Sequence, residues 1–158
     1  AERNRRRAAR LAENLQRAGS GRERALLADA AAPPLRAMDA VLLDAPCLGT
    51  GTFARHPDAR LRVTPEALRE LARTQATLLE GAATAVRPGG LLVYATCSLE
   101  PEENEEQVAR FLISHAEFSR EPSTTVPAEC LSGAGDLVLL PQRHGTDGAF
   151  AARLRRRP

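Results

Sequence analysis

Two short runs of apolar residues constrain this chain most strongly. Residues 40–43 read Ala-Val-Leu-Leu and residues 91–95 read Leu-Leu-Val-Tyr-Ala, with no charged side chain in either run. Continuous apolar runs of this length are typical of strands buried on both faces of a parallel sheet. We extend the first strand to residues 38–43. Parallel neighbours need a crossover connection, which is usually a helix.

The segment between the two runs predicts that helix. Thr64-Pro65-Glu66 combines a capping hydroxyl, a proline at the first helical position and an acid near the positive end of the helix dipole. Apolar residues then recur on one helical face, at Leu68, Leu71, Ala72, Leu78, Leu79, Ala82, Ala83 and Val86. The sequence Pro88-Gly89-Gly90 predicts a turn into the second run.

The N-terminal segment predicts one more helix and one more strand. Apolar residues recur at helical spacing over residues 8–18, and the glycines of Gly19-Ser20-Gly21 can end that helix. Residues 24–28 are interpreted as a short strand that ends at Asp29.

The C-terminal segment completes the alternation of strands and helices. A helix is expected from Pro101, with Val108, Phe111 and Leu112 facing the core. Residues 136–140 and 149–154 predict two closing strands, joined by a hairpin around residues 145–148. The whole chain of 158 residues therefore predicts a single α/β domain whose sheet has a mixed edge.

Charge is unevenly distributed along the chain. The net charge is only +2, but eight Arg lie within residues 1–24 and four within residues 153–157. Basic ends fit contact with nucleic acid, and a solvated helix face with a frayed tail explains them equally. The five Glu of residues 100–106 suit the start of a helix.

Cysteine usage favours a reducing compartment. The chain has three Cys, no CxxC pair, no signal peptide and no apolar run of transmembrane length. We therefore expect a cytoplasmic protein with no membrane partner. The three His are scattered, which argues against a metal site.

Two of the cysteines follow the apolar runs directly. Cys47 lies in Asp44-Ala45-Pro46-Cys47, and Cys97 lies in Thr96-Cys97-Ser98. Loops at the carboxyl ends of neighbouring strands meet over the ligand crevice of an open α/β sheet, so two thiols there can act on one substrate. Cys97 is also expected just before a helix N-terminus, where the dipole favours the nucleophilic thiolate. Taken singly, each cysteine is equally explained as a structural residue in a turn.

Several motifs together resemble one enzyme family. The segments DAPCLGTG, HPDARLR, QATLLEGAATAVRPGGLLVYATCSLEPEENEEQVARFL and GTDGAFAARL are similar, in order and spacing, to the Sun family of RNA cytosine-5 methyltransferases. The resemblance is greatest to its bacterial branch, which acts on 16S ribosomal RNA. It implies a Rossmann-like class I methyltransferase sheet, S-adenosylmethionine as cofactor and RNA as partner.

The resemblance also implies roles for individual residues. Cys97 would attack C6 of the target cytosine, Cys47 would assist loss of the C5 proton and release of the enzyme, and Asp44 would contact the cytosine edge. Glu2 matches an acid that binds the ribose hydroxyls and Asp29 a residue that faces the adenine. Asp44 and Pro46 complete the expected cofactor contacts.

The loop after Cys47 carries three arginines. Arg55, Arg60 and Arg62 are candidates for gripping RNA phosphates near a flipped base, and simple solvation explains them equally. His56 is interpreted as a loop-shaping residue, and Cys130 is assigned no role.

The chain departs from the family pattern at its start. The glycine-rich cofactor loop, strand one and most of strand two are missing, and Gly19-Ser20-Gly21 is no substitute because it follows a helix. We therefore expect the C-terminal portion of a methyltransferase catalytic domain that alone binds S-adenosylmethionine weakly or not at all. Two alternatives stay open: a non-catalytic RNA-binding remnant, and a DNA cytosine-5 methyltransferase in which Cys47 attacks.

Overall fold

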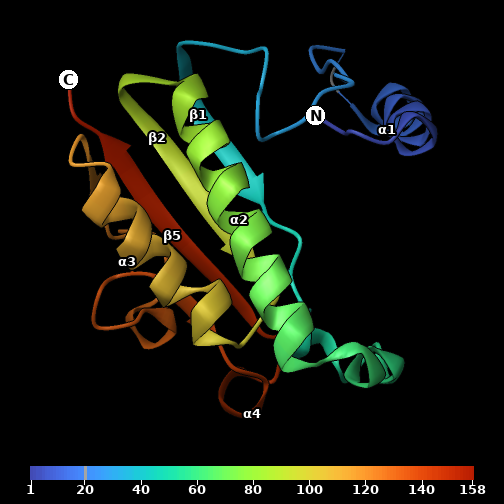
Figure 1. The fold of residues 1–158 in the computed structure, drawn as a ribbon, viewed down its shortest axis with the longest axis vertical. Helices are drawn as coiled ribbons and strands as arrows, with labels where there is room; N and C mark the ends of the chain where they lie inside the picture. Colours follow the sequence, from blue (N-terminus) through green and yellow to red (C-terminus); the bar gives the residue numbers. More distant parts are fainter. Residues whose placement is uncertain (20) are drawn as a thin grey trace.

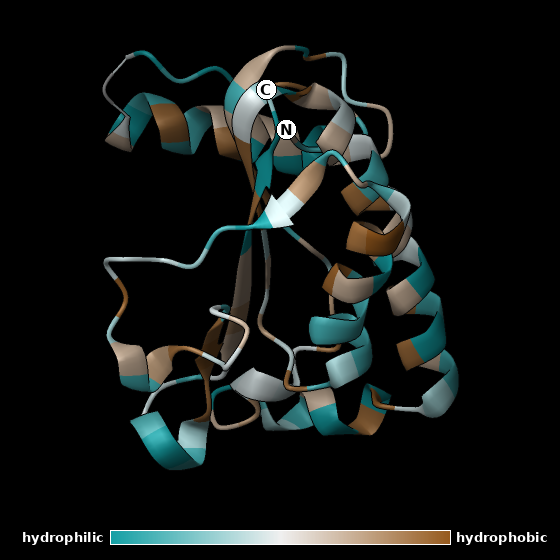
Figure 2. Ribbon diagram, turned by 90° about the vertical axis from the view of Figure 1, so that its left-hand side faces the viewer, coloured by the Kyte–Doolittle hydropathy of each residue, from teal (hydrophilic) through white to brown (hydrophobic). Residues whose placement is uncertain are grey.

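The computed structural model describes residues 1–19 and 21–158. A mixed sheet runs through the molecule, and helices α2 (Pro65–Ala85) and α3 (Glu105–Ser114) pack side by side on one of its faces (Figure 1). Both helices show alternating hydrophilic and hydrophobic stretches in Figure 2, as amphipathic helices do. Helix α1 (Arg5–Ala18) lies beyond one edge of the sheet and has no buried residue.

The predicted parallel pair is confirmed as β1 (Met38–Asp44) and β2 (Val86–Thr96). Their register pairs Ala40 with Leu91 and Asp44 with Ala95. The two strands therefore end level with each other, and the loops that follow them start at the same edge of the sheet.

The C-terminal strands form the expected mixed edge. Strand β5 (Ala149–Arg156) pairs antiparallel with β2, and on its other side it pairs with β3 (Phe118–Arg120) and β4 (Leu137–Leu139). Strands β4 and β5 are the two predicted closing strands, and the short helix α4 (Pro141–His144) lies in the connection between them.

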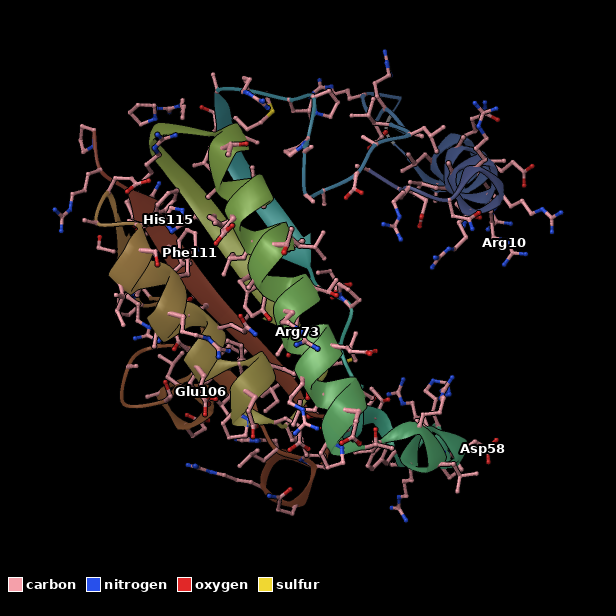
Figure 3. The ribbon with its side chains drawn as sticks, in the orientation of Figure 1. Arg10, Asp58, Arg73, Glu106, Phe111 and His115 are labelled. Carbon is pink, nitrogen blue, oxygen red and sulfur yellow. The ribbon has the colours of Figure 1, made fainter. Side chains whose placement is uncertain are left out.

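The core consists mainly of aliphatic side chains from the sheet and the two covering helices. Leu79 of α2 and Val108 of α3 pack against Leu92, Tyr94 and Leu154 of the strands. Phe111 stacks on His115 with ring centroids 4.2 Å apart at the end of α3 (Figure 3). Aromatics are only 3% of the residues, so most of this core is built from Ala, Leu and Val.

Local signals placed the start of α2 and the end of α1. The Thr64 side chain accepts a hydrogen bond from the Ala67 N–H, which caps α2 as its sequence predicts. Helix α1 ends at Ala18, followed by Gly19, and Ser20 of the predicted glycine-rich stop lies outside the described residues. No helix in the described part of the chain is both long enough and apolar enough to cross a membrane.

Two expectations about strands are wrong. Residues 24–28 form no strand but a single bridge, in which Leu27 pairs with Glu2; Glu2 makes the backbone hydrogen bonds to this segment, with the Leu26 carbonyl and the Ala28 N–H. Pro88-Gly89-Gly90 does not precede the second strand but belongs to β2, which starts at Val86 directly after α2. In place of the expected turn, the pairing of β2 with β1 has an irregular register between Met38 and Ala40.

Candidate active site

The loops after β1 and β2 bring the two predicted cysteines together. The Sγ atoms of Cys47 and Cys97 lie 3.3 Å apart, and neither is in a disulfide. Cys97 is exposed, whereas Cys47 is half-buried. A pair of thiols at one strand edge, one open to solvent and one behind it, can present a nucleophile together with a second proton-transfer group.

The two thiols differ in their surroundings, and for Cys47 these surroundings change the pKa. Burial raises the pKa of Cys47 to about 12, and the hydrogen bond with Cys97 adds to the increase. Cys47 is therefore held as a neutral thiol, whose S–H can donate to the sulfur of Cys97. The expected helix N-terminus directly after Cys97 is not there: a 3-10 turn (Pro101–Glu103) comes first, and α3 begins only at Glu105. The helix dipole consequently gives Cys97 no direct support.

Gly51 joins the two cysteine loops to the β4–β5 connection. Its N–H donates to the Cys97 carbonyl at 3.0 Å, and its carbonyl accepts from the Gly148 N–H at 2.8 Å. A Cβ at Gly51 would lie 2.6 Å from the Gly148 oxygen and 2.8 Å from the Cys97 oxygen. Only glycine fits this approach of three backbone segments.

Hydroxyl groups complete the framework around Cys97. The Thr50 Oγ1 accepts from the Leu99 N–H at 2.8 Å and lies 3.3 Å from the buried Ser98 hydroxyl. The Ser98 hydroxyl in turn accepts from the Glu100 N–H at 3.1 Å. The Cys97 loop is thus fixed on both sides of the thiol.

One of the predicted cofactor residues, Asp44, lines a groove, and two others, Glu2 and Asp29, are chain neighbours of lining residues. The groove has a volume of about 390 Å³ and is lined by Asp44, by Ala1 next to Glu2, and by Ala30 next to Asp29. The Asn4 N–H donates to the Glu2 carboxylate at 2.7 Å and lowers its pKa, so this acid stays ionised. The groove volume of about 390 Å³ lies within the range of small-molecule sites.

The other predicted cofactor residues differ in burial: Asp29 is half-buried, and Asp44 and Pro46 are exposed. Asp29 accepts from the Ala31 N–H at 2.9 Å and pairs with Arg3 at 3.5 Å. Asp44 is exposed at the end of β1, and Pro46 is exposed one residue before Cys47.

The three loop arginines are exposed but differ in their contacts. Arg55 pairs with Asp147 at 3.1 Å, the Arg60 guanidinium lies over the Phe53 ring at 5.4 Å, and Arg62 projects from the second 3-10 turn of the loop (Pro57–Arg62). Arg55 therefore also ties its loop to the β4–β5 connection.

Sequence reasoning missed part of the site. Glu103 and Asn104 were assigned to a helix start only as members of an acidic run, yet both are buried beside the cysteine loops. The one available signal was the position of Asn104 within a run that is otherwise glutamate from 102 to 106.

The sheet and its covering helices have a fold similar to that of solved Rossmann-like methyltransferases. A solved methyltransferase homologue from Pyrococcus horikoshii matches 97% of the chain with a TM-score of 0.75 at 30% identity, and the chain covers 51% of it. The model of the family described as 16S rRNA methyltransferase RsmB/F matches residues 1–155, so the chain belongs to that family.

Further relatives agree with this assignment. The ribosomal RNA small subunit methyltransferase B of Thermus thermophilus is 47% identical over 116 residues, which are 73% of this chain and 29% of that protein. NSun6 from Pyrococcus horikoshii, solved with SFG, has a TM-score of 0.83 at 31% identity over 98% of this chain and 40% of its own. The chain spans less than a third of the length of the first curated relatives it matches.

Proposed function

We propose that the protein carrying this chain is an S-adenosylmethionine-dependent RNA cytosine-5 methyltransferase, with small-subunit ribosomal RNA as its substrate and the cytoplasm as its compartment. The observation that carries the proposal is the 3.3 Å separation of the Cys47 and Cys97 sulfurs at the carboxyl ends of two parallel strands. The family and the names of its relatives support the methyltransferase class and the ribosomal RNA substrate.

In this proposal Cys97 is the nucleophile. Its sulfur is exposed and so can reach a base that has left its stack. The S–H bond of Cys97 breaks and its proton passes to solvent, a bond forms between the Cys97 sulfur and C6 of cytosine, and the C5=C6 electron pair moves to C5, which becomes nucleophilic. S-adenosylmethionine supplies the methyl group that C5 accepts.

Cys47 assists the release of the enzyme. Elimination breaks the C5–H and C6–S bonds. The C5–H electron pair restores the C5=C6 double bond, the Cys97 sulfur leaves with its own electron pair, and the C5 proton passes to the Cys47 sulfur once that sulfur has given its proton to Cys97. Because burial keeps Cys47 as a thiol at 3.3 Å, its S–H is placed to donate to the departing sulfur. Asp44, three residues earlier and exposed, is assigned to the edge of the cytosine ring.

The family and a neighbouring structure support the choice of cofactor, while the groove beside β1 is lined by Asp44 and otherwise by apolar residues. Glu2 is assigned to the ribose hydroxyls, from which a carboxylate can accept hydrogen bonds, and Asp29 is assigned to the adenine; each is the chain neighbour of a residue that lines this groove. The neighbouring structure of NSun6 carries SFG, an analogue of S-adenosylmethionine. The exposed Arg55, Arg60 and Arg62 are assigned to RNA phosphates.

The assignment of the two cysteines is tested by alanine substitution in the complete protein that carries this chain. With RNA and S-adenosylmethionine, Cys47→Ala should accumulate a covalent protein–RNA adduct that resists denaturing electrophoresis, and Cys97→Ala should form none. Cys130→Ala removes the third free cysteine and serves as the matched control. An adduct in Cys97→Ala but not in Cys47→Ala would instead indicate the chemistry of DNA cytosine methyltransferases. Binding of RNA without methyl transfer or adduct would indicate a non-catalytic module.

A further inference from the structure

Two consecutive residues in the turn before α3 are buried, although their neighbours are not. Glu103 has none of its surface exposed and Asn104 has 4%, while Glu105 and Glu106 lie at the surface. A buried carboxylate or amide is costly unless its polar atoms are hydrogen-bonded. The partners of these two side chains therefore indicate what they do.

Glu103 holds the backbone on both sides of Cys47. Both of its carboxylate oxygens accept from the Leu48 N–H, at 3.1 and 3.2 Å. Its Oε1 also accepts from Gln75 Nε2 at 2.8 Å, and the same Nε2 donates to the Pro46 carbonyl at 2.9 Å. The peptide group before Cys47 and the one after it are thus both fixed, so the direction of the Cys47 side chain is fixed with them.

Asn104 does the same for the other cysteine. Its Oδ1 accepts from the Thr96 hydroxyl at 2.6 Å, and its Nδ2 donates to the Ser98 carbonyl at 2.9 Å. Thr96 and Ser98 are the residues directly before and after Cys97. One side chain therefore bridges the chain across the exposed thiol.

The turn that carries both residues is anchored in the core. The hydroxyl of Tyr94, which is fully buried, donates to the Glu103 carbonyl at 2.6 Å. Burial and the nearby Glu103 charge raise the pKa of Tyr94, so the phenol remains a hydrogen-bond donor at neutral pH. The Tyr94 ring packs edge-on against Phe150 of β5. Glu103 and Asn104 therefore act from a rigid support.

We propose that Glu103 and Asn104 are positioning residues that set the two thiols against each other. Glu103 and Gln75 fix the backbone on both sides of Cys47 and so orient its side chain. Asn104 does so for Cys97. The geometric part of this proposal stands on the contacts alone, and its catalytic consequence rests on the proposed function.

A dithiol–disulfide equilibrium measures the geometry without any methyl transfer. In a glutathione buffer, Cys47 and Cys97 react with one oxidised glutathione to give one intramolecular disulfide and two reduced glutathiones, and the equilibrium constant reports the effective concentration of one thiol at the other. Glu103→Gln and Asn104→Asp, in a Cys130→Ala background, should each lower this constant about tenfold or more. Glu106→Gln is the control, since Glu106 is exposed on the first turn of α3 (Figure 3). Constants equal to that of the control would overturn the proposal.

A second measurement separates positioning from general loosening of the fold. In the adduct assay, Glu103→Gln should behave like Cys47→Ala and accumulate adduct, whereas Asn104→Asp should form adduct slowly. The same defect in both variants would contradict separate roles. If Glu103→Gln does not fold, Gln75→Met replaces it, because it removes the bond to the Pro46 carbonyl and leaves the Leu48 contact. Failure of every variant and of wild type to form adduct would count against the proposed function, while the disulfide result would still decide the geometry.

Discussion

A methyl group added at Gly51 should be more damaging than at any open glycine of the chain. The new Cβ of Gly51→Ala would lie 2.6 Å from the Gly148 oxygen and 2.8 Å from the Cys97 oxygen, where ordinary contact begins at 3.4 Å. The backbone must therefore open by 0.6–0.8 Å on two sides. Both obstructing segments are hydrogen-bonded to Gly51 itself, so they cannot move away without weakening those bonds.

The expected cost follows from these two effects. Overpacking costs about 1–3 kcal/mol, and weakening the hydrogen bonds adds about 1 kcal/mol. A loss of about 3 kcal/mol in the free energy of unfolding corresponds to a fall in melting temperature of roughly 6–12 °C for a chain of this size. Thermal and urea unfolding followed by circular dichroism would measure both quantities.

Gly133→Ala is the matched control. No atom lies within 4 Å of a Cβ at Gly133, so its melting temperature should stay close to that of the wild type. If Gly51→Ala melts at the same temperature as Gly133→Ala, the three backbone segments are not packed as the structure has them. Glycine would then not be required at this junction.

Two further substitutions test an ion pair and a helix cap. Hydrogen bonds from Arg155 and Arg153 lower the pKa of Glu121 from 4.5 to about 2. Because the folded-state pKa is depressed, this contribution to stability is present above pH 4.5 and is lost as the pH falls towards 2. Glu121→Gln should therefore have a lower melting temperature than wild type at neutral pH. The difference in melting temperature should shrink as the pH falls from 4.5 towards 2. A difference that does not change with pH would contradict the ion pair. Thr64→Ala removes the acceptor of the Ala67 N–H and should cost about 1 kcal/mol in urea unfolding, and an unchanged midpoint would show that the cap contributes nothing.

Elements with a strong local signal could be predicted from the sequence. The uncharged runs that became β1 and β2 and the capping sequence at Thr64 each carry their information within a few neighbouring residues. The strand prediction for residues 24–28 failed because a strand needs a partner strand, and among residues 1–19 and 21–158 only Glu2 forms a bridge there. The turn predicted at Pro88-Gly89-Gly90 was wrong because an irregularity in strand register can take the place of a turn.

The sequence predicted that the two cysteines would meet at one edge of the sheet, but it did not predict the residues that hold them. Cys47 and Cys97 follow strands that end level, which the α/β pattern implies. Nothing local distinguishes Glu103 from Glu106, because all the glutamates of this run suit a helix start equally. Only the packing of the turn beneath the two loops buries the first and leaves the second exposed.

The sequence by itself determined that two thiols would be delivered to one edge of a mainly aliphatic α/β sheet, because burial patterns and caps are properties of neighbouring residues. The tertiary structure alone decided that their sulfurs lie 3.3 Å apart, that Cys97 is exposed and that Cys47 is held as a thiol. These features depend on side chains about 50 residues apart in the chain, whose separation follows from strand register and loop contacts.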